Sequence, residues 1–339
     1  MSPNPTRRQL LAAGGLGVAA LGGGALAYAG SRASNQGPTG SESPLQWIGD
    51  GMDSESESGY QRSFLCWSQP RYESRKADLP ESAKQDWQDG SAYLPSDTFR
   101  EAISVETAVF SNYSPGRGFA TSGTVDVDTL VNAEFPAREI LRGRGNDLDV
   151  AVEQRESHRG LDVYRQQFVS SGLSRAIAVN DSTCVVSNLY EESSKAVDTV
   201  KSIADNWFDG SQRLSETSDA FDRFTSLLDP GFVANISIGE AHTPRGTTIA
   251  FDGDTAVSRE VVLEPKIQSN MCEERTVEQN IEGVMDQPMR NRFDSVSNVN
   301  VDISDGAGVV ELSIPIEEVD PTWETLDFYR RGVFATCVD

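Results

Sequence analysis

The sequence predicts an α+β fold of two domains, each with an antiparallel sheet whose one face is covered by helices. Three observations carry this prediction. Apolar and polar residues alternate in short runs between turn residues, as in half-buried strands. Two further stretches repeat apolar residues at helical spacing. Both halves run strand pair, helix, strand pair, a symmetry that also suggests a duplicated unit.

The first half predicts three strand pairs and one helix. Residues 115–118, Pro-Gly-Arg-Gly, are expected to turn the first pair into a hairpin. A helix should begin near Asp126 or Asp128, because aspartate caps the free N–H groups of a first helical turn. Residues 157–160 are interpreted as a polar turn. The strands are expected at 103–109, 119–125, 148–154, 161–168, 176–179 and 183–187.

Two helices are expected next, each with an apolar stripe that faces the core. The first stripe runs from Val197 to Trp207 and ends before Gly210, and the second runs from Phe221 to Leu228 and ends at Pro230. A third helix should begin at Thr276, where the spacing is that of a capping box. Strands of the second half are expected at 232–238, 246–251, 256–263, 299–303 and 310–316.

The charge balance excludes one class of partner and indicates an environment. The chain has 339 residues, with 52 Asp plus Glu against 29 Lys plus Arg, a net charge of −23. Such a surface repels phosphate backbones and has no basic stripe, so we expect no nucleic-acid partner. Molar salt screens carboxylate repulsion, and the composition resembles that of secreted haloarchaeal proteins.

The N-terminus resembles a twin-arginine export signal of a haloarchaeal protein. Arg7 and Arg8 are followed by an uncharged stretch of Ala, Gly and Leu, and Ala27-Tyr28-Ala29 has the small-x-small form of a cleavage site. The resemblance implies cleavage after Ala29 and an extracytoplasmic, secreted or surface-associated protein. The alternative is an uncleaved anchor, since about 20 uncharged residues can span the bilayer; this would be the chain's only membrane contact.

These features divide the chain into four segments. Residues rich in Ser, Gly and Glu follow the signal and bury too little to fold alone, apart from the apolar patch at 45–48. The segments are a signal peptide at 1–29, a flexible acidic linker at 30–61, a first α+β domain at 62–230 and a second at 231–339.

Four cysteines in an exported chain suggest disulfides. The candidates are Cys66, Cys184, Cys272 and Cys337. Pairing within each predicted domain, Cys66 with Cys184 and Cys272 with Cys337, is the simplest of three possibilities. Buried free thiols are the main alternative, because no two cysteines have the spacing of a metal or redox motif.

The sequence contains no recognisable catalytic or cofactor motif. Its two histidines, His158 and His242, are expected in exposed loops, so we predict neither a metal nor a cofactor. The sequons at Asn112 and Asn180 fall in predicted turns and are candidate glycosylation sites, whereas the sequon at Asn235 falls in a predicted strand.

Two hypotheses for function remain. The first is a non-enzymatic binding or interaction module at the cell surface, whose partner is a surface protein or a small solute. The second is a secreted hydrolase, an esterase or glycosidase that uses an Asp/Glu pair. A deep pocket that holds two carboxyl groups, one with a raised pKa, would favour the hydrolase.

The acidic composition predicts that the fold depends on salt. Dilution from molar salt to tens of millimolar extends charge repulsion over about 10 Å or more, and should lower the unfolding temperature. Thermal unfolding of the mature chain followed by circular dichroism at several NaCl concentrations measures this. An unfolding temperature that does not change with salt would contradict the halophilic interpretation.

Overall fold

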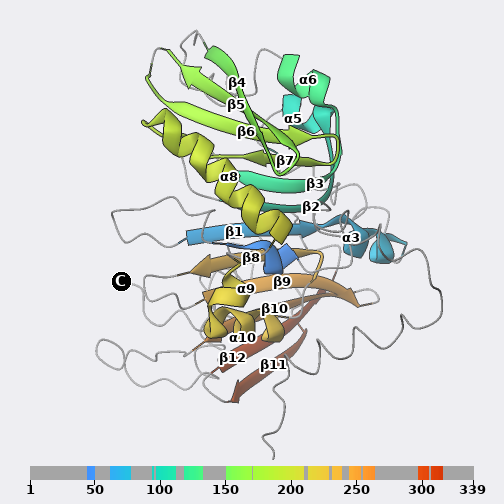
Figure 1. Ribbon diagram of the computed structural model, residues 1–339. Helices are drawn as coiled ribbons and strands as arrows, with labels where there is room; N and C mark the ends of the chain where they lie inside the picture. The colour runs from blue at the N-terminus through green and yellow to red at the C-terminus, as the bar shows by residue number, and fades with distance from the viewer. Residues whose placement is uncertain are drawn as a thin grey trace, which may run out of the picture. The chain divides into compact units, whose positions relative to one another are not determined.

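The computed structural model places twelve strands in one antiparallel sheet (Figure 1). It describes residues 44–49, 62–77, 94, 97–111, 118–132, 150–169, 171–209, 213–228, 231–238, 244–252, 255–263, 297–304 and 307–315. The strands are β1 (Arg62–Ser68), β2 (Ile103–Ser111), β3 (Phe119–Val125), β4 (Val150–His158), β5 (Leu161–Phe168), β6 (Ser174–Asn180), β7 (Thr183–Val186), β8 (Val233–Ile238), β9 (Pro244–Asp252), β10 (Thr255–Leu263), β11 (Ser297–Ser304) and β12 (Ala307–Pro315).

Helices connect or flank these strands. They are α3 (Gln69–Lys76), α5 (Asp97–Ala102), α6 (Val127–Asn132), α8 (Ser193–Asp209), α9 (Leu214–Thr217) and α10 (Asp219–Leu227), with a short 3-10 helix, η2 (Pro44–Trp47). Within these described residues, none of the helices has the length and apolarity needed to cross a membrane.

One continuous sheet replaces the two expected sheets. Its strand order is β11-β12-β10-β9-β8-β1-β2-β3-β7-β6-β5-β4, which leaves β11 and β4 at the edges. The strand β1 lies at the junction, where Cys66 is in register with Val109 of β2 on one side and with Ala234 of β8 on the other. The sheet therefore passes without a break between the segments 62–230 and 231–339.

The predicted hairpins are confirmed in pairing, with one change in phase. The pairs β2–β3, β4–β5, β6–β7 and β11–β12 are all antiparallel. In β2, however, the register shifts between Val105 and Thr107, so one extra residue enters this strand. This bulge turns Ile103 and Val105 to the face opposite Val109, although the sequence pattern predicts all three on one face.

The apolar stripes of α8 and α10 pack on one face of the sheet, as expected. Trp207 of α8 and Phe221 and Phe224 of α10 are almost fully buried, in a cluster with sheet residues such as Val163 and Val261. α8 lies over β5, β6 and β7, whereas α10 lies over β9 and β10 (Figure 1). One apolar core therefore extends along this face over both ends of the sheet.

Helices also contact the opposite face, so their predicted restriction to one face is wrong. The ring of Trp67 in β1 lies 5.6 Å from Tyr72 of α3, and its sequence neighbour Cys66 faces the α8 side. Phe99 of α5 likewise packs edge-on against Phe119 of β3, with ring centroids 5.2 Å apart. Both faces of the central strands are buried because aromatic side chains alternate with residues of the first core.

Cys66 and Cys184 are free, buried thiols, so the expected bond between them is wrong. Cys66 belongs to β1 and Cys184 to β7, and the strands β2 and β3 lie between them. Three strand spacings of about 4.8 Å exceed the separation that a disulfide spans. Burial raises the pKa of both thiols. Cys272 and Cys337 lie outside the described residues.

Part of the predicted linker docks onto the fold. Leu45 and Ile48 are buried in the cluster under α8 and α10, and the carbonyl of Ile48 accepts a 2.9 Å hydrogen bond from the Leu214 N–H. This is the apolar patch that the sequence set apart from the rest of the linker. The docked patch belongs to residues 37–339, which form one compact unit.

The bulge in β2 predicts an intolerance to side chains at Gly123. Its φ is 147°, and a Cβ there would lie 1.8 Å from the Ser104 carbonyl oxygen. Gly123→Ala should therefore destabilise the fold by about 3 kcal/mol or more, measured by thermal unfolding in concentrated salt. Gly160 also has a positive φ but open space around it, so Gly160→Ala should cost only about 1 kcal/mol. Equal losses would contradict the steric argument.

Candidate binding groove

An open groove lies between the β4–β5 hairpin and α8. Its volume is about 580 Å³, which is in the range of small-ligand sites. Charged and polar side chains dominate its lining, with Val197 as the apolar exception: Glu153, Gln154, Arg155, Glu156, Arg165, Ser193, Ser194, Val197, Asp198 and Lys201. The groove therefore suits a polar occupant.

A bulge in β4 directs several of these side chains towards α8. Glu153 is in register with Arg165 of β5, whereas His158 is in register with Leu161, because one extra residue enters β4 between Gln154 and Ser157. Leu161 packs in the core under α8, so His158 faces that helix. Without the bulge, strict alternation from Glu153 would turn His158 away from α8.

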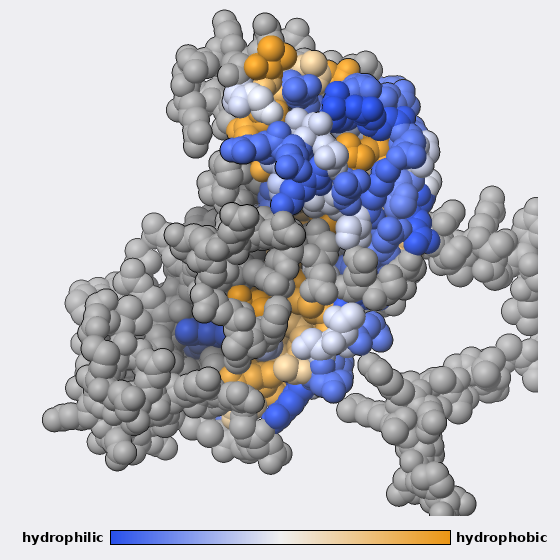
Figure 2. Space-filling view, turned by 60° about the vertical axis from the view of Figure 1, so that its left-hand side comes forward, coloured by the Kyte–Doolittle hydropathy of each residue, from blue (hydrophilic) through white to orange (hydrophobic). Residues whose placement is uncertain are grey.

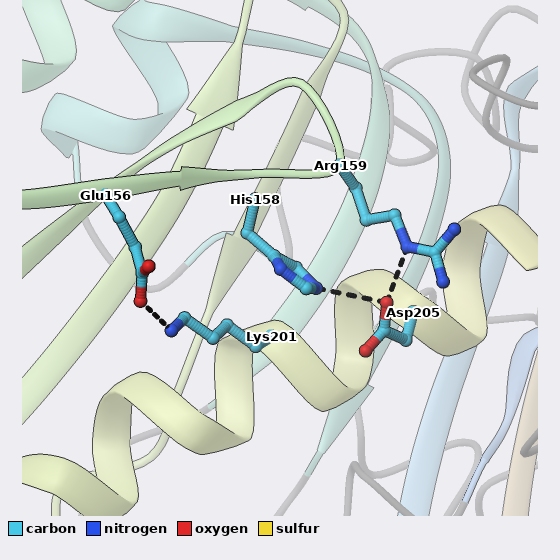
Figure 3. Close-up of polar contacts among 5 residues, drawn as sticks. All are labelled: Glu156, His158, Arg159, Lys201 and Asp205. Carbon is cyan, nitrogen blue, oxygen red and sulfur yellow. Dashed lines mark hydrogen bonds and ion pairs between the residues drawn. The ribbon is translucent and has the colours of Figure 1, made fainter.

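The helix supplies the other wall by its periodicity. The apolar stripe of α8 is buried against the sheet, which leaves Asp198, Lys201 and Asp205 along its polar side at intervals of three and four residues. In Figure 3, Lys201 points towards Glu156 and Asp205 points towards His158 and Arg159. Two elements far apart in the sequence thus meet through charged side chains.

The carboxylate of Glu156 forms an ion pair with the Lys201 ammonium. Lys201 donates a hydrogen bond to Oε1, and this bond lowers the pKa of Glu156 below its usual value. The positive charge of Lys201 acts in the same direction. Glu156 is therefore held as a carboxylate, which is the opposite of what an acid catalyst requires.

Asp205 joins the end of β4 to the end of α8. Its Oδ1 lies 3.0 Å from Nε2 of His158 and accepts a 2.6 Å hydrogen bond from Nε of Arg159. His158 was expected in an exposed turn. It is instead the last residue of β4 and is half-buried, because the turn shortens to Arg159 and Gly160, which both have positive φ.

This His–Asp contact lacks the third member of a hydrolytic triad among the described residues. The neighbouring hydroxyl, Ser157 Oγ, donates to Oδ1 of Asp162 at 2.7 Å and so is engaged elsewhere. The contact between His158 and Asp205 connects the strand β4 with the helix α8. This contact lies next to Glu156 and Lys201, which line the groove (Figure 3).

A second cluster of ion pairs also lines the groove. Oε2 of Glu153 lies 2.9 Å from an amino nitrogen of Arg155 and 2.5 Å from one of Arg165. The other amino nitrogen of Arg165 donates to Oγ of Ser193 at 3.1 Å. Arg155 and Arg165 therefore share the carboxylate of Glu153, whereas Lys201 pairs with Glu156, so two carboxylates of β4 contact the three cations of the groove.

The structure places the sequence-predicted candidates in different regions. Asn180 ends β6, where its Nδ2 donates to the Gly160 carbonyl at 3.2 Å and its Oδ1 accepts from the Ser182 N–H at 2.9 Å. Asn235 is buried in β8. The export residues Arg7, Arg8, Ala27 and Ala29, the sequon at Asn112 and His242 lie outside the described residues.

Sequence reasoning missed the groove. The only local signal for it was the spacing of Asp198, Lys201 and Asp205 on the polar side of a predicted helix. The partners of these residues follow from strand pairing and from the bulge in β4. In the part of the chain that the structure describes, no group of three His, Cys, Asp or Glu side chains is arranged to hold a metal ion.

Comparisons with known proteins add little. No family model matches the chain, and no curated protein matches it. Among solved structures it is similar to crystal forms I and IV of TP0453, each at 11% sequence identity over 80% of this chain and 94% of that chain. The TM-scores are 0.38 and 0.31, which are too low to support an argument about function.

The Glu156–Lys201 pair predicts a measurable change in titration. Lys201→Met should raise the Glu156 pKa back towards 4.5, because its hydrogen-bond donor and opposite charge are removed. The pair stabilises the fold above the ordinary glutamate pKa, and this contribution is lost as the pH falls through the lowered one. Carboxyl ¹³C NMR measures both values.

Lys195→Met is the matched control, since Lys195 lies on the same helix over the Tyr190 ring, 5.7 Å from its centroid. This variant should leave the Glu156 titration unchanged. An identical Glu156 titration curve in wild type and Lys201→Met would contradict the contact.

Proposed function

We propose that the chain is an exported, non-enzymatic binding module that acts in brine at the cell surface or outside the cell. The resemblance to a twin-arginine signal at Arg7 and Arg8 supports export. The net charge of −23 supports a salt-rich environment. Binding in the groove between β4 and α8 is the activity that the geometry supports best.

The observation that carries this proposal is the pairing of charges in the groove. Glu153 and Glu156 both contact cations, and the pKa of Glu156 is lowered rather than raised. A glycosidase needs one carboxyl group that keeps its proton at working pH. Paired charges on a rigid strand and helix instead fit recognition of a polar partner.

The groove favours a partner that carries a cation. Asp198 forms no ion pair with any of the described residues, while Arg155, Arg165 and Lys201 are already engaged. The three cations and three carboxylates of the lining balance in total, but Asp198 is the carboxylate of the lining without an ion pair among the described residues, so the local charge at this position is negative. An amine-bearing solute, or a basic side chain of a surface protein, matches it.

The alternative of a secreted hydrolase finds no support in this groove. A hydrolytic site would combine a carboxyl group of raised pKa with an apolar wall. Val197 is the one apolar residue of the lining. The hydrolase hypothesis would need a different site.

We also propose that the fold arose by duplication of one α+β unit. The strands β5 to β7 carry α8 on one face, and the strands β9 and β10 carry α10 on the same face. This similar placement of α8 and α10 supports two duplicated units, joined edge to edge at β1. A duplication of this kind would give each end of the sheet its own helix-covered surface.

Titration with an amine tests the binding proposal. Spermidine added to the mature chain in concentrated NaCl should give saturable NMR shifts at the Asp198 carboxyl group. Asp198→Asn should weaken this binding by about tenfold, since one charge-assisted contact is lost. Glu101→Gln removes an exposed carboxylate on α5, outside the groove, and should leave the affinity unchanged. Equal affinities in wild type and Asp198→Asn, or no saturation, would contradict the proposal.

A further inference from the structure

A fully buried arginine lies on the face of the sheet opposite α8. The side chain of Arg175, in β6, is 1% exposed, and none of its three guanidinium nitrogens has a hydrogen-bond partner among the residues that the structure describes. Its neighbours along the strand, Ser174 and Ala176, point the other way, and Ala176 packs in the core under α8. Arg175 therefore projects from the opposite face into the buried side of the sheet.

Arg175 differs in its partners from two part-buried arginines of the sheet, Arg245 and Arg259. Arg245 donates through Nε at 2.9 Å to Glu260, a carboxylate that is itself almost fully buried. Arg259 donates through Nε at 2.8 Å to Glu311 and thereby lowers the pKa of that glutamate. Arg245 and Arg259 are thus paired with carboxylates of the chain, whereas Arg175 has no such partner among the described residues.

A second unsatisfied group lies directly beside Arg175. Gln166 of β5 is in register with Arg175, so the two side chains share a face. Gln166 is fully buried, and within the described part of the chain neither its Oε1 nor its Nε2 has a hydrogen-bond partner. Two adjacent buried side chains therefore present five polar atoms without partners.

An unpartnered guanidinium at this depth carries a large cost. Desolvation lowers the pKa of Arg175 to about 10, and the group therefore remains protonated at neutral pH. A buried charge is tolerated when it is paired and hydrogen-bonded. Because the described chain supplies no such partner, a negative group from outside the chain is the simplest way to complete the pair.

We propose that Arg175 and Gln166 form a binding site for a small oxyanion, a carboxylate or a phosphate group. The guanidinium fork offers two parallel N–H donors, which match two oxygens of either group. Nε2 of Gln166 supplies a further donor from the neighbouring strand. This site is separate from the groove, because Arg175 and Gln166 face away from α8.

The surroundings favour a small anion. Ile177 follows on the same face of β6, and Phe168 follows on the same face of β5; both are almost fully buried. Apolar side chains offer no hydrogen bonds to the rest of a large polar ligand. The site therefore fits the charged group itself, either as a free ion or as the end of a larger molecule.

Thermal unfolding of the mature chain tests this site, with acetate and inorganic phosphate as probes. Each probe replaces NaCl at constant ionic strength, so general salt effects stay fixed. The unfolding temperature of the wild type should rise with probe concentration and then saturate, since an anion that binds the folded state stabilises it. The probe that acts at lower concentration identifies the preferred group.

Variants assign the effect to the site. Arg175→Met should abolish the response, and without a probe its unfolding temperature should exceed that of the wild type, because an unpaired buried charge is removed. Gln166→Leu should retain the response with about tenfold weaker affinity. Arg100→Met removes an exposed arginine that pairs with Asp97, and should respond like the wild type.

Three results would overturn the proposal. The first is no response of the wild type to either probe. The second is an equal response in Arg175→Met. The third is a loss of stability in Arg175→Met without a probe, since that would show that Arg175 is already paired. Because spermidine binding in the groove is measured separately, failure of this site leaves the groove proposal standing.

Discussion

The fold depends on the pairing of β1 with two partners at once. Hydrogen bonds to β2 on one side and β8 on the other make a single sheet from strands that are far apart in sequence. Register passes from strand to strand, so the orientation of Cys66 and Trp67 in β1 also decides which side chains face α8 in the neighbouring strands. A break at β1 would separate the two ends of the sheet and divide the core under the helices.

Bulges in β2 and β4 then shift this register by one residue. The bulge in β2 distributes apolar residues to both faces of the central strands, and Gly123 makes room for it. The bulge in β4 affects the contact with the helix, because it turns His158 towards α8 and brings Arg159 to Asp205. In both strands, one extra residue changes which face of the sheet the following side chains point to.

Charge is distributed unevenly in this acidic chain. Carboxylates are abundant at the surface, whereas the few cations near the groove are each held by a glutamate. Arg245 and Arg259 are paired in the same way, with glutamates of the sheet. The buried Arg175 departs from this pattern, because it has no carboxylate partner among the described residues. Asp198 is the carboxylate of the groove lining without an ion pair among those residues. The two binding proposals rest on these two groups.

The sequence by itself determined every strand except β1, together with the apolar stripes of α8 and α10 and the cap of α6, where Asp126 accepts a 3.0 Å hydrogen bond from the Thr129 N–H. These features depend on local periodicity and turn chemistry, which a linear pattern contains. Tertiary structure alone decided that one sheet forms, that Cys66 and Cys184 lie too far apart to bond, and that Lys201 meets Glu156. Strand order and bulges are set by contacts between distant segments, and a one-residue shift reverses the face of every side chain that follows. For that reason the groove and the buried Arg175 were invisible until the strands had been paired.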